Sequence, residues 1–578
     1  MPAHDPTEPV ESLPASRTVL FQKRQWLSVL GSVFLVAIVL LAYLPALQGG
    51  FVWDDDSWTT KLLRVLQDTS GLRAIWLEPK TLQQYYPLSG TTFWLDYQLW
   101  EFRPLPYHVE NVLLHALAAL LFWRSLRALR VPGAELASAI FALHPLMVES
   151  AAWITERKNV LSLCLCLASF LAFLRSRYGA ERRGSGEGEA PGAAARRRMS
   201  QSAPFYLLAL LLFVAAMSAK TSVCTMPAAT LLLIWFRSGA LRWREDVLPM
   251  LPFFAVALGM GAVTVWLEQT HVGARGTDYA LTFSQRGLIA GRAFWFYLGK
   301  LLWPANLCFI YPRWQPDVAA FWQWLYPAAA LALFVTLWQK RRLVGRGPIT
   351  ALLFFAGTLA PLLGFVNVYF MRYSFVCDHW AYLPSLGPIA LASAGLAKLL
   401  QKLGQTLAAK SALVGALLFT LFVLTTQRAT MYTDLETLWR TAIRDNPDSW
   451  AAHNNLGNAL FRHGNVTEAV SCFMRAIELK PDLAEAHTSL GVALASSGQI
   501  DEAIVKFKEA IRVSPEYAEA HYDLGLALNG TGQRDEAIHE FQEAIRLKPG
   551  FAAAKKSLRS TLSRRRHDEI GGINQGSN

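Results

Sequence analysis

Residues 26–47 read WLSVLGSVFLVAIVLLAYLPAL, an apolar run without a single charged side chain. A helix of about 20 such residues crosses the roughly 30 Å hydrocarbon core of a bilayer. Arg17, Lys23 and Arg24 precede the run, and basic residues beside a first span favour the cytoplasmic side. The run is longer than the core of a secretory signal and lacks a small-residue cleavage site, so we interpret it as a signal anchor that leaves residues 1–25 in the cytoplasm.

The whole chain of 578 residues is 53% hydrophobic and only 17% charged. This composition argues against an ordinary soluble enzyme and predicts an all-α, multi-pass helical membrane domain over residues 26–428. Ten more apolar blocks follow the first and give eleven predicted spans in all. They are 107–126, 134–153, 159–175, 204–219, 222–237, 247–267, 321–339, 349–370, 380–397 and 411–428. An odd number of crossings places the C-terminus on the non-cytoplasmic side.

Charge distribution supports this topology. The net charge is +12, but much of the excess Lys and Arg flanks apolar blocks on the predicted cytoplasmic side, which indicates orientation and no nucleic-acid partner. Segment 176–203 is rich in Gly, Ala and Arg and is predicted to be a flexible cytoplasmic loop. Block 287–305 mixes basic and aromatic residues, so we expect an outer interfacial helix; a crossing helix is the alternative. Cys308 and Cys377 fall in predicted outer loops, and the sequence does not decide whether they form a disulfide.

After Arg428 the sequence becomes periodic. Pro447, Pro481, Pro515 and Pro549 are each 34 residues apart, and Leu, Gly and Ala positions repeat with the same period. A 34-residue period with small residues where paired helices touch is typical of tetratricopeptide repeats. We predict an α-solenoid of three full repeats over 432–558 and a disordered tail over 559–578. Its concave groove suits an extended peptide or a partner protein, and a plain spacer is the alternative.

Three consecutive aspartates, Asp54, Asp55 and Asp56, begin the first outer loop, residues 48–106. Adjacent carboxylates repel, so such a run near a low-dielectric surface is costly unless a cation or a proton binds. One interpretation is therefore a catalytic base or a site for a divalent cation such as Mg²⁺ or Mn²⁺. The other is a solvated turn or a helix N-cap, for which Asp is common.

Ionisable residues also fall inside or beside the predicted spans. His144 and Glu149 lie within the third span, where an ionisable side chain indicates function by default, although His144 also suits helix packing. Glu149 and Glu156 share a face if that helix continues. A second group could hold a phosphate or lie among lipid headgroups. Its members are Arg157, Lys158 and Lys220.

Several stretches, taken together, resemble one family. They are GFVWDDDSW, YYPLS, LWEFRPLPYHVENVLLHALAAL, FALHPLMVESAAWITERKN, AKTSVCTMP, YLGKLLWPANLCFIYP and CDHWAYLPSLG. In this order, and followed by the repeats, they are similar to the transmembrane and tetratricopeptide-repeat-containing O-mannosyltransferases and their bacterial relatives. The resemblance implies a C-type membrane glycosyltransferase that takes a sugar from a polyprenyl-phosphate carrier on the non-cytoplasmic side.

The resemblance also assigns roles to residues. It makes Asp54, Asp55 and Glu149 catalytic, with Asp54 and Asp55 as the ligands of any divalent cation. Its substrate-binding residues here are His144, Glu156, Arg157, Lys158, Lys220, Asp378, His379 and Tyr382. This chain departs from the family pattern at Tyr86, Met147 and His379, which bears on the sugar and the acceptor more than on the fold.

The function implied is inverting transfer of a mannose-like sugar to Ser or Thr hydroxyls of an acceptor protein bound by the repeats. Two other classes stay open: a non-enzymatic membrane-anchored scaffold or assembly factor, and a transporter of lipid-linked sugars. We expect a bacterial inner-membrane protein with cytoplasmic N-terminus and periplasmic repeats; in a eukaryote the endoplasmic reticulum membrane would take its place.

Overall fold

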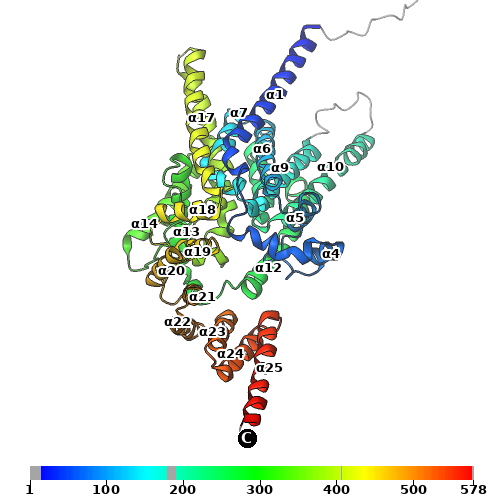
Figure 1. The fold of residues 1–578 in the computed structure, drawn as a ribbon. Helices are drawn as coiled ribbons and strands as arrows, with labels where there is room; N and C mark the ends of the chain where they lie inside the picture. Colours follow the sequence, from blue (N-terminus) through cyan, green and yellow to red (C-terminus); the bar gives the residue numbers. More distant parts are fainter. Residues whose placement is uncertain (1–14, 179–190, 405, 576–578) are drawn as a thin grey trace, which may run out of the picture. The chain divides into compact units, whose positions relative to one another are not determined.

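The computed structural model describes residues 15–178, 191–404 and 406–575, and within these ranges the regular elements are all helical (Figure 1). The chain divides into two compact units, which we describe separately. The membrane unit comprises Met1–Ala305, Pro316–Tyr369 and Asp378–Thr430. The repeat unit comprises Asn306–Gln315, Phe370–Cys377 and Met431–Asn578. The predicted all-α class is confirmed.

Among the described residues, six helical segments are long and apolar enough to cross a bilayer. They are Pro104–Ala128, Ile154–Tyr178, Ser202–Ala219, Trp243–Val272, Phe321–Arg342 and Leu407–Tyr432. Shorter apolar helices are Ser28–Ala42 within α1 (Ala15–Ala42), Ala134–Leu143 and Gly347–Leu362. The multi-pass character is thereby confirmed, whereas the predicted number of eleven spans stays a prediction. The predicted N-terminal segment 1–25 lies largely outside the described residues.

The third predicted span, 134–153, is not one helix, and this prediction was wrong. Helix α7 (Ala134–Leu143) ends before Pro145, which cannot donate a backbone hydrogen bond. A 3-10 turn (Pro145–Met147), the short helix α8 (Val148–Ala152) and a second turn (Ile154–Glu156) follow, and only then does α9 (Arg157–Tyr178) begin. Glu149 and Glu156 therefore do not share a continuous helix face.

The later elements of the membrane unit differ from the predicted blocks mainly at their ends. Helix α10 spans Pro191–Ala219, so part of the predicted loop 176–203 is helical, and residues 179–190 of that loop lie outside the described residues. The block 287–305 lies in α13 (Phe283–Leu302), which is not among the six long apolar segments. The remaining helices are α11 (Met226–Ser238), α12 (Leu251–Leu267), α14 (Phe321–Gln339), α15 (Gly347–Leu359), α16 (Leu386–Lys402) and α17 (Leu407–Ala429).

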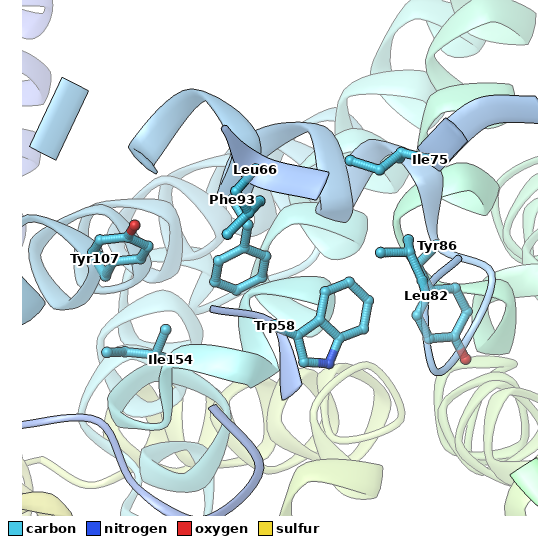
Figure 2. Packing of buried hydrophobic residues seen from close by; sticks show 8 residues of the cluster. All are labelled: Trp58, Leu66, Ile75, Leu82, Tyr86, Phe93, Tyr107 and Ile154. Atoms are coloured by element: carbon cyan, nitrogen blue, oxygen red, sulfur yellow. The ribbon is translucent and has the colours of Figure 1, made fainter. Parts of the chain in front are cut away.

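The predicted first outer loop, residues 48–106, is a folded structure rather than a solvated linker. It contains α4 (Thr69–Leu77) and α5 (Pro87–Trp100), and it is followed by α6 (Pro104–Ala128). Figure 2 shows its apolar core, in which Trp58 lies beside Phe93 and Tyr86 lies beside Leu82. Ile154, from the broken segment between α7 and α9, belongs to the same cluster. Burial of these large side chains fixes the loop against that segment.

The repeat unit is built from paired helices. The pairs are α19 and α20 (Trp450–Arg462, Val466–Leu479), α21 and α22 (Ala484–Ser496, Ile500–Val513), and α23 and α24 (Ala518–Gly530, Arg534–Leu547). Within each pair a glycine of the first helix faces a phenylalanine of the second: a Cβ added to Gly491 would lie 2.5 Å from Phe507. The recurrent glycine therefore permits close packing of the two helices.

Both ends of the solenoid are closed by extra structure. Helix α18 (Leu435–Asp445) precedes the first helix pair, and Phe309, from the Asn306–Gln315 segment, packs on its Trp439 with ring centroids 5.6 Å apart. At the other end α25 spans Ala552–Gln575, where a disordered tail was predicted. A terminal helix covers the apolar side of the last repeat, as the buried Ala554 indicates.

Candidate functional site

The three aspartates occupy a 3-10 turn, Trp53–Ser57, and have different environments. Asp55 is fully buried, and both of its carboxylate oxygens are used. One accepts from the Val52 amide at 2.8 Å; the other accepts from the Thr155 amide at 2.8 Å and the Thr155 hydroxyl at 2.5 Å. Asp55 therefore fastens the first outer loop to the broken segment that precedes α9.

Asp54 has the opposite character. Its Oδ1 atom is buried and has no hydrogen-bond partner among the residues that the structure describes. Burial raises the pKa of Asp54 to about 6, and the nearby Lys158 ammonium opposes that rise. Burial likewise raises the pKa of Asp55 to about 7. Asp56, by contrast, forms an ion pair with the exposed Lys61 at 2.9 Å.

Trp53, immediately before these aspartates, has a left-handed backbone with φ of 45°. Such a conformation is strained for a bulky residue and is often found at functional sites. Its ring stacks on Trp153 with centroids 5.3 Å apart and planes 12° apart. The stack brings the aspartate turn and the broken segment together a second time.

Glu156 is the centre of a buried charge cluster. Its Oε1 lies 3.0 Å from Nζ of Lys158, and its Oε2 lies 3.2 Å from Nζ of Lys220. Asn159 donates to Oε2 at 2.5 Å and also to the His379 carbonyl oxygen at 3.2 Å. Two ammonium groups are thus held at one place by the Glu156 carboxylate, and their remaining N–H donors suit an anion.

His379 joins this cluster to Glu149. Its Nδ1 lies 2.8 Å from Oε1 of Glu149, and its Nε2 lies 4.0 Å from Oε1 of Glu156. The other oxygen of Glu149, Oε2, is buried and unpartnered within the described part of the chain. The His379 ring therefore lies between two carboxylates that are seven residues apart in sequence.

The other predicted site residues have contacts of their own, away from these atoms. His144 accepts from the Leu146 amide at 3.2 Å and its Nε2 lies 3.1 Å from the Leu301 carbonyl oxygen. The Tyr382 hydroxyl lies 2.7 Å from Nδ1 of His115. Asp378 lies 3.4 Å from the Arg428 guanidinium. A substrate-binding role for each of them stays a prediction.

Arg157 is completely buried, and every nitrogen of its guanidinium has a partner. It pairs with Asp96 and, at 3.0 Å, with Glu110, donates to the Asn111 Oδ1 at 2.9 Å, and donates to the Tyr107 carbonyl oxygen at 3.1 Å. Its guanidinium also lies over the Phe93 ring at 4.8 Å. In this arrangement Arg157 anchors the start of α9, while Lys158, next to it, faces the charge cluster.

Sequence reasoning missed several residues of the site. Thr155 and Asn159 are small polar residues that carry no signal in the sequence, because their partners, Asp55 and the His379 carbonyl oxygen, are far away along the chain. Glu268 lies near the end of a long apolar segment, and an acidic residue in that position is itself a sequence signal for function. Its carboxylate accepts hydrogen bonds from the Gln84 side chain at 2.8 Å and from the Tyr369 amide at 3.2 Å, and it thereby connects two loops. Burial, assisted by the Glu268 carboxylate, raises the pKa of Tyr86 to about 12, so its hydroxyl stays protonated.

The side chains present do not supply the ligand set of a hard divalent cation. Mg²⁺ binds about six oxygens in octahedral geometry, several of them from water or substrate. Both oxygens of Asp55 already accept hydrogen bonds, and Asp54 contributes one buried oxygen, Oδ1, without a partner among the described residues, near the Lys158 ammonium. Among the described residues there is no group of three or more acidic, His or Cys side chains placed for a metal ion.

Comparison with known proteins agrees with both units. Models described as TPR repeat and Tetratricopeptide repeat match residues 457–498, 493–532 and 518–551, which confirms the predicted repeats. Two solved structures are similar in part. The Arabidopsis OM64 TPR domain is 20% identical, over 20% of this chain and 95% of its own, at a TM-score of 0.20. The MamA protein is 25% identical, over 24% and 77%, at 0.22.

Curated relatives extend across the membrane unit. Protein O-mannosyl-transferase TMTC1 of Homo sapiens is 27% identical over 74% of this chain, and TMTC4 of Homo sapiens is 24% identical over 75%. TMTC3 of Homo sapiens is 30% identical over 25% of this chain. The chain spans 53%, 64% and 17% of the lengths of these three relatives. The chain is therefore a multi-pass membrane protein that is similar, over most of its length, to proteins named as protein O-mannosyl-transferases, and this agrees with the resemblance seen in its sequence.

Proposed function

We propose that this protein is a membrane glycosyltransferase that moves a mannose-like sugar from a polyprenyl-phosphate carrier to Ser or Thr hydroxyls of an acceptor protein. The observation that carries this proposal is the unpartnered, buried Oδ1 of Asp54 beside the Lys158 and Glu156 charge cluster. A carboxylate with a raised pKa next to a cationic anion site is the arrangement expected of a general base beside a phosphate leaving group. The relatives named as O-mannosyl-transferases support the same chemistry.

The reaction balances as a single displacement. Asp54 accepts the proton of the acceptor hydroxyl while the hydroxyl oxygen attacks the anomeric carbon. A new carbon–oxygen bond forms as the bond from that carbon to the phosphate oxygen breaks, which inverts the anomeric configuration. The polyprenyl phosphate leaves with the electron pair, and the ammonium groups of Lys158 and Lys220 stabilise its charge. Asp55 holds the turn in place through Thr155.

The remaining parts receive roles that follow from this reaction. The six apolar segments anchor the protein in the bilayer that contains the lipid carrier. The repeats bind the acceptor protein in their concave groove. We place the site and the repeats on the non-cytoplasmic face, with the N-terminus in the cytoplasm of a bacterial inner membrane, because the basic residues before the first span favour that orientation.

Transfer from the lipid carrier tests the proposal. Purified protein in proteoliposomes is given radiolabelled mannosyl polyprenyl phosphate and a Ser/Thr-rich acceptor protein. We expect labelled acceptor whose linkage has the opposite anomeric configuration to the donor, and an initial labelling rate lower by about 100-fold or more for an Asp54→Asn variant. Acceptor binding without sugar transfer would favour a scaffold. Movement of intact lipid-linked sugar across the bilayer without transfer would favour a transporter.

A further inference from the structure

The broken segment between α7 and α9 carries Glu149, Thr155 and Glu156, and Lys158 follows in the first turn of α9. Where a helix breaks, carbonyl groups lose their helical partners, and within a membrane no bulk water replaces them. Such irregular backbone is stable only if neighbouring helices supply donors. The position of the catalytic groups therefore depends on the residues that satisfy these carbonyls.

One face of α6 supplies those donors. His115 Nε2 lies 3.1 Å from the Ala142 carbonyl oxygen, and Asn111 Nδ2 donates to the Trp153 and Ile154 carbonyl oxygens, each at 3.1 Å. His108 Nδ1 lies 3.0 Å from the Ala152 carbonyl oxygen. Positions i, i+3 and i+7 share one helix face, so the three side chains form a ladder beside both breaks. All three are fully buried.

The same ladder reaches the aspartate loop. The second ring nitrogen of His108, Nε2, lies 3.3 Å from the carbonyl oxygen of Gly50, four residues before Asp54. His108 thus lies between the aspartate loop, at Gly50, and the broken segment, at Ala152; a neutral imidazole has one N–H, so it donates to one of these carbonyl oxygens and packs against the other. Asn111 adds a further link, because its Oδ1 accepts from the buried Arg157 at the start of α9.

We propose that His108, Asn111 and His115 are positioning residues that set the catalytic geometry, with His108 fixing the distance between Asp54 and the Glu156–Lys158 cluster. The expected effect on the rate of sugar transfer rests on the proposed transferase function. The expected effect on the backbone of residues 48–58 and 144–156 does not depend on that function. None of the three needs to touch substrate: each acts by holding the backbone that presents a catalytic side chain. A misplaced reacting group lowers the rate of the chemical step more than it weakens substrate binding.

The test uses the full-length protein with His108→Ala, His108→Asn and a matched control, Ser125→Ala. Ser125 is also buried on α6, but within the described part of the chain its hydroxyl donates to the Leu121 carbonyl oxygen of its own helix alone. For His108→Ala we expect kcat for sugar transfer to fall at least tenfold while KM for the lipid donor changes less than twofold. Ser125→Ala should leave both constants within twofold of wild type.

Hydrogen exchange gives a readout that does not depend on activity. His108→Ala should speed amide exchange in residues 48–58 and 144–156, without change in the repeats. His108→Asn retains an amide donor near the Nδ1 position, which faces the Ala152 carbonyl oxygen, but has no group at the Nε2 position, which faces Gly50. Amide exchange should therefore rise in 48–58, whereas exchange in 144–156 should stay close to that of wild type. If His108→Ala does not fold, the His108→Asn variant still tests the positioning role.

Each result decides a separate question. Unchanged exchange in both segments of His108→Ala, or unchanged exchange in 48–58 of His108→Asn, overturns the positioning role. Equal kinetic loss in Ser125→Ala overturns it too, because that loss would reflect general damage to α6. If the wild-type protein transfers no sugar but the exchange pattern appears as expected, the transferase proposal fails and the ladder stands.

Discussion

Asp54 and Asp55 are neighbours with opposite predicted responses to the same substitution. Asp54→Asn removes a carboxylate whose Oδ1 has no partner in the described structure, so the folded protein loses little and is relieved of a buried charge. We expect its stability to stay within about 1 kcal/mol of wild type. Its transfer rate should fall by about 10²- to 10⁴-fold, the usual contribution of a general base.

Asp55→Asn should behave in the reverse manner. The carboxylate accepts from three donors, Val52 N–H, Thr155 N–H and the Thr155 hydroxyl. Asparagine keeps one acceptor oxygen, and its amide group opposes a donor at the other position. A lost hydrogen bond to a charged group costs about 1.5–3 kcal/mol, with a further cost for the donor left unpaired. Because burial already disfavours the Asp55 charge, we expect a net loss of about 2–4 kcal/mol.

Thermal unfolding in detergent, measured beside the transfer assay, separates the two variants. The midpoint for Asp54→Asn should lie near that of wild type, and the midpoint for Asp55→Asn should fall by several degrees. Asp56→Asn is the matched control and should change neither quantity, since Asp56 is only half-buried and its ion pair is with the exposed Lys61. The reasoning is refuted if Asp54→Asn unfolds early, or if Asp55→Asn is as stable as wild type.

Three further predictions concern pH and packing. Since only ionised Asp54 accepts a proton and burial raises its pKa to about 6, kcat/KM for transfer should rise between pH 5 and 7 and then level off; a flat profile contradicts the assignment. Gly491→Ala pushes a methyl group against Phe507 and should destabilise the repeat unit by about 1–3 kcal/mol in chemical denaturation, whereas Gly530→Ala, with open space around it, should not. The hydrogen bond to Glu540 raises the pKa of His521 in the folded protein. The stabilisation from this pair is therefore present at low pH and is lost as the pH rises through the pKa of His521 in the folded state. The repeats should unfold at a higher temperature at pH 5.5 than at pH 8, and Glu540→Gln should reduce this difference.

The repeat fold could be predicted from the sequence because its information is local and periodic. Gly491 and its equivalents recur every 34 residues, and each meets a phenylalanine of the same repeat. The Asn306–Gln315 and Phe370–Cys377 segments could not be assigned to the repeat unit in this way. They are loop sequences whose partners lie far along the chain, as with Asn446, which donates to the Ile310 carbonyl at 3.0 Å.

The candidate site was predictable by residue type but not by role. Asp54, Glu156, Lys158 and Lys220 do meet, as charged groups beside apolar segments suggested. The break at Pro145 was hidden because an apolar block with one proline also fits a kinked span. Arg157 looks like a phosphate ligand until its burial against Asp96, 61 positions earlier in the chain, is known.

The most direct test of the account is the single-turnover rate of sugar transfer by Asp54→Asn against Asp56→Asn, with lipid donor bound in advance and acceptor added last. We predict that Asp56→Asn transfers at the wild-type rate and that Asp54→Asn, though folded and loaded with donor, is slower by at least 100-fold, at the lower end of the range for loss of a general base. Equal rates for the two variants would contradict the claim that Asp54 takes the proton.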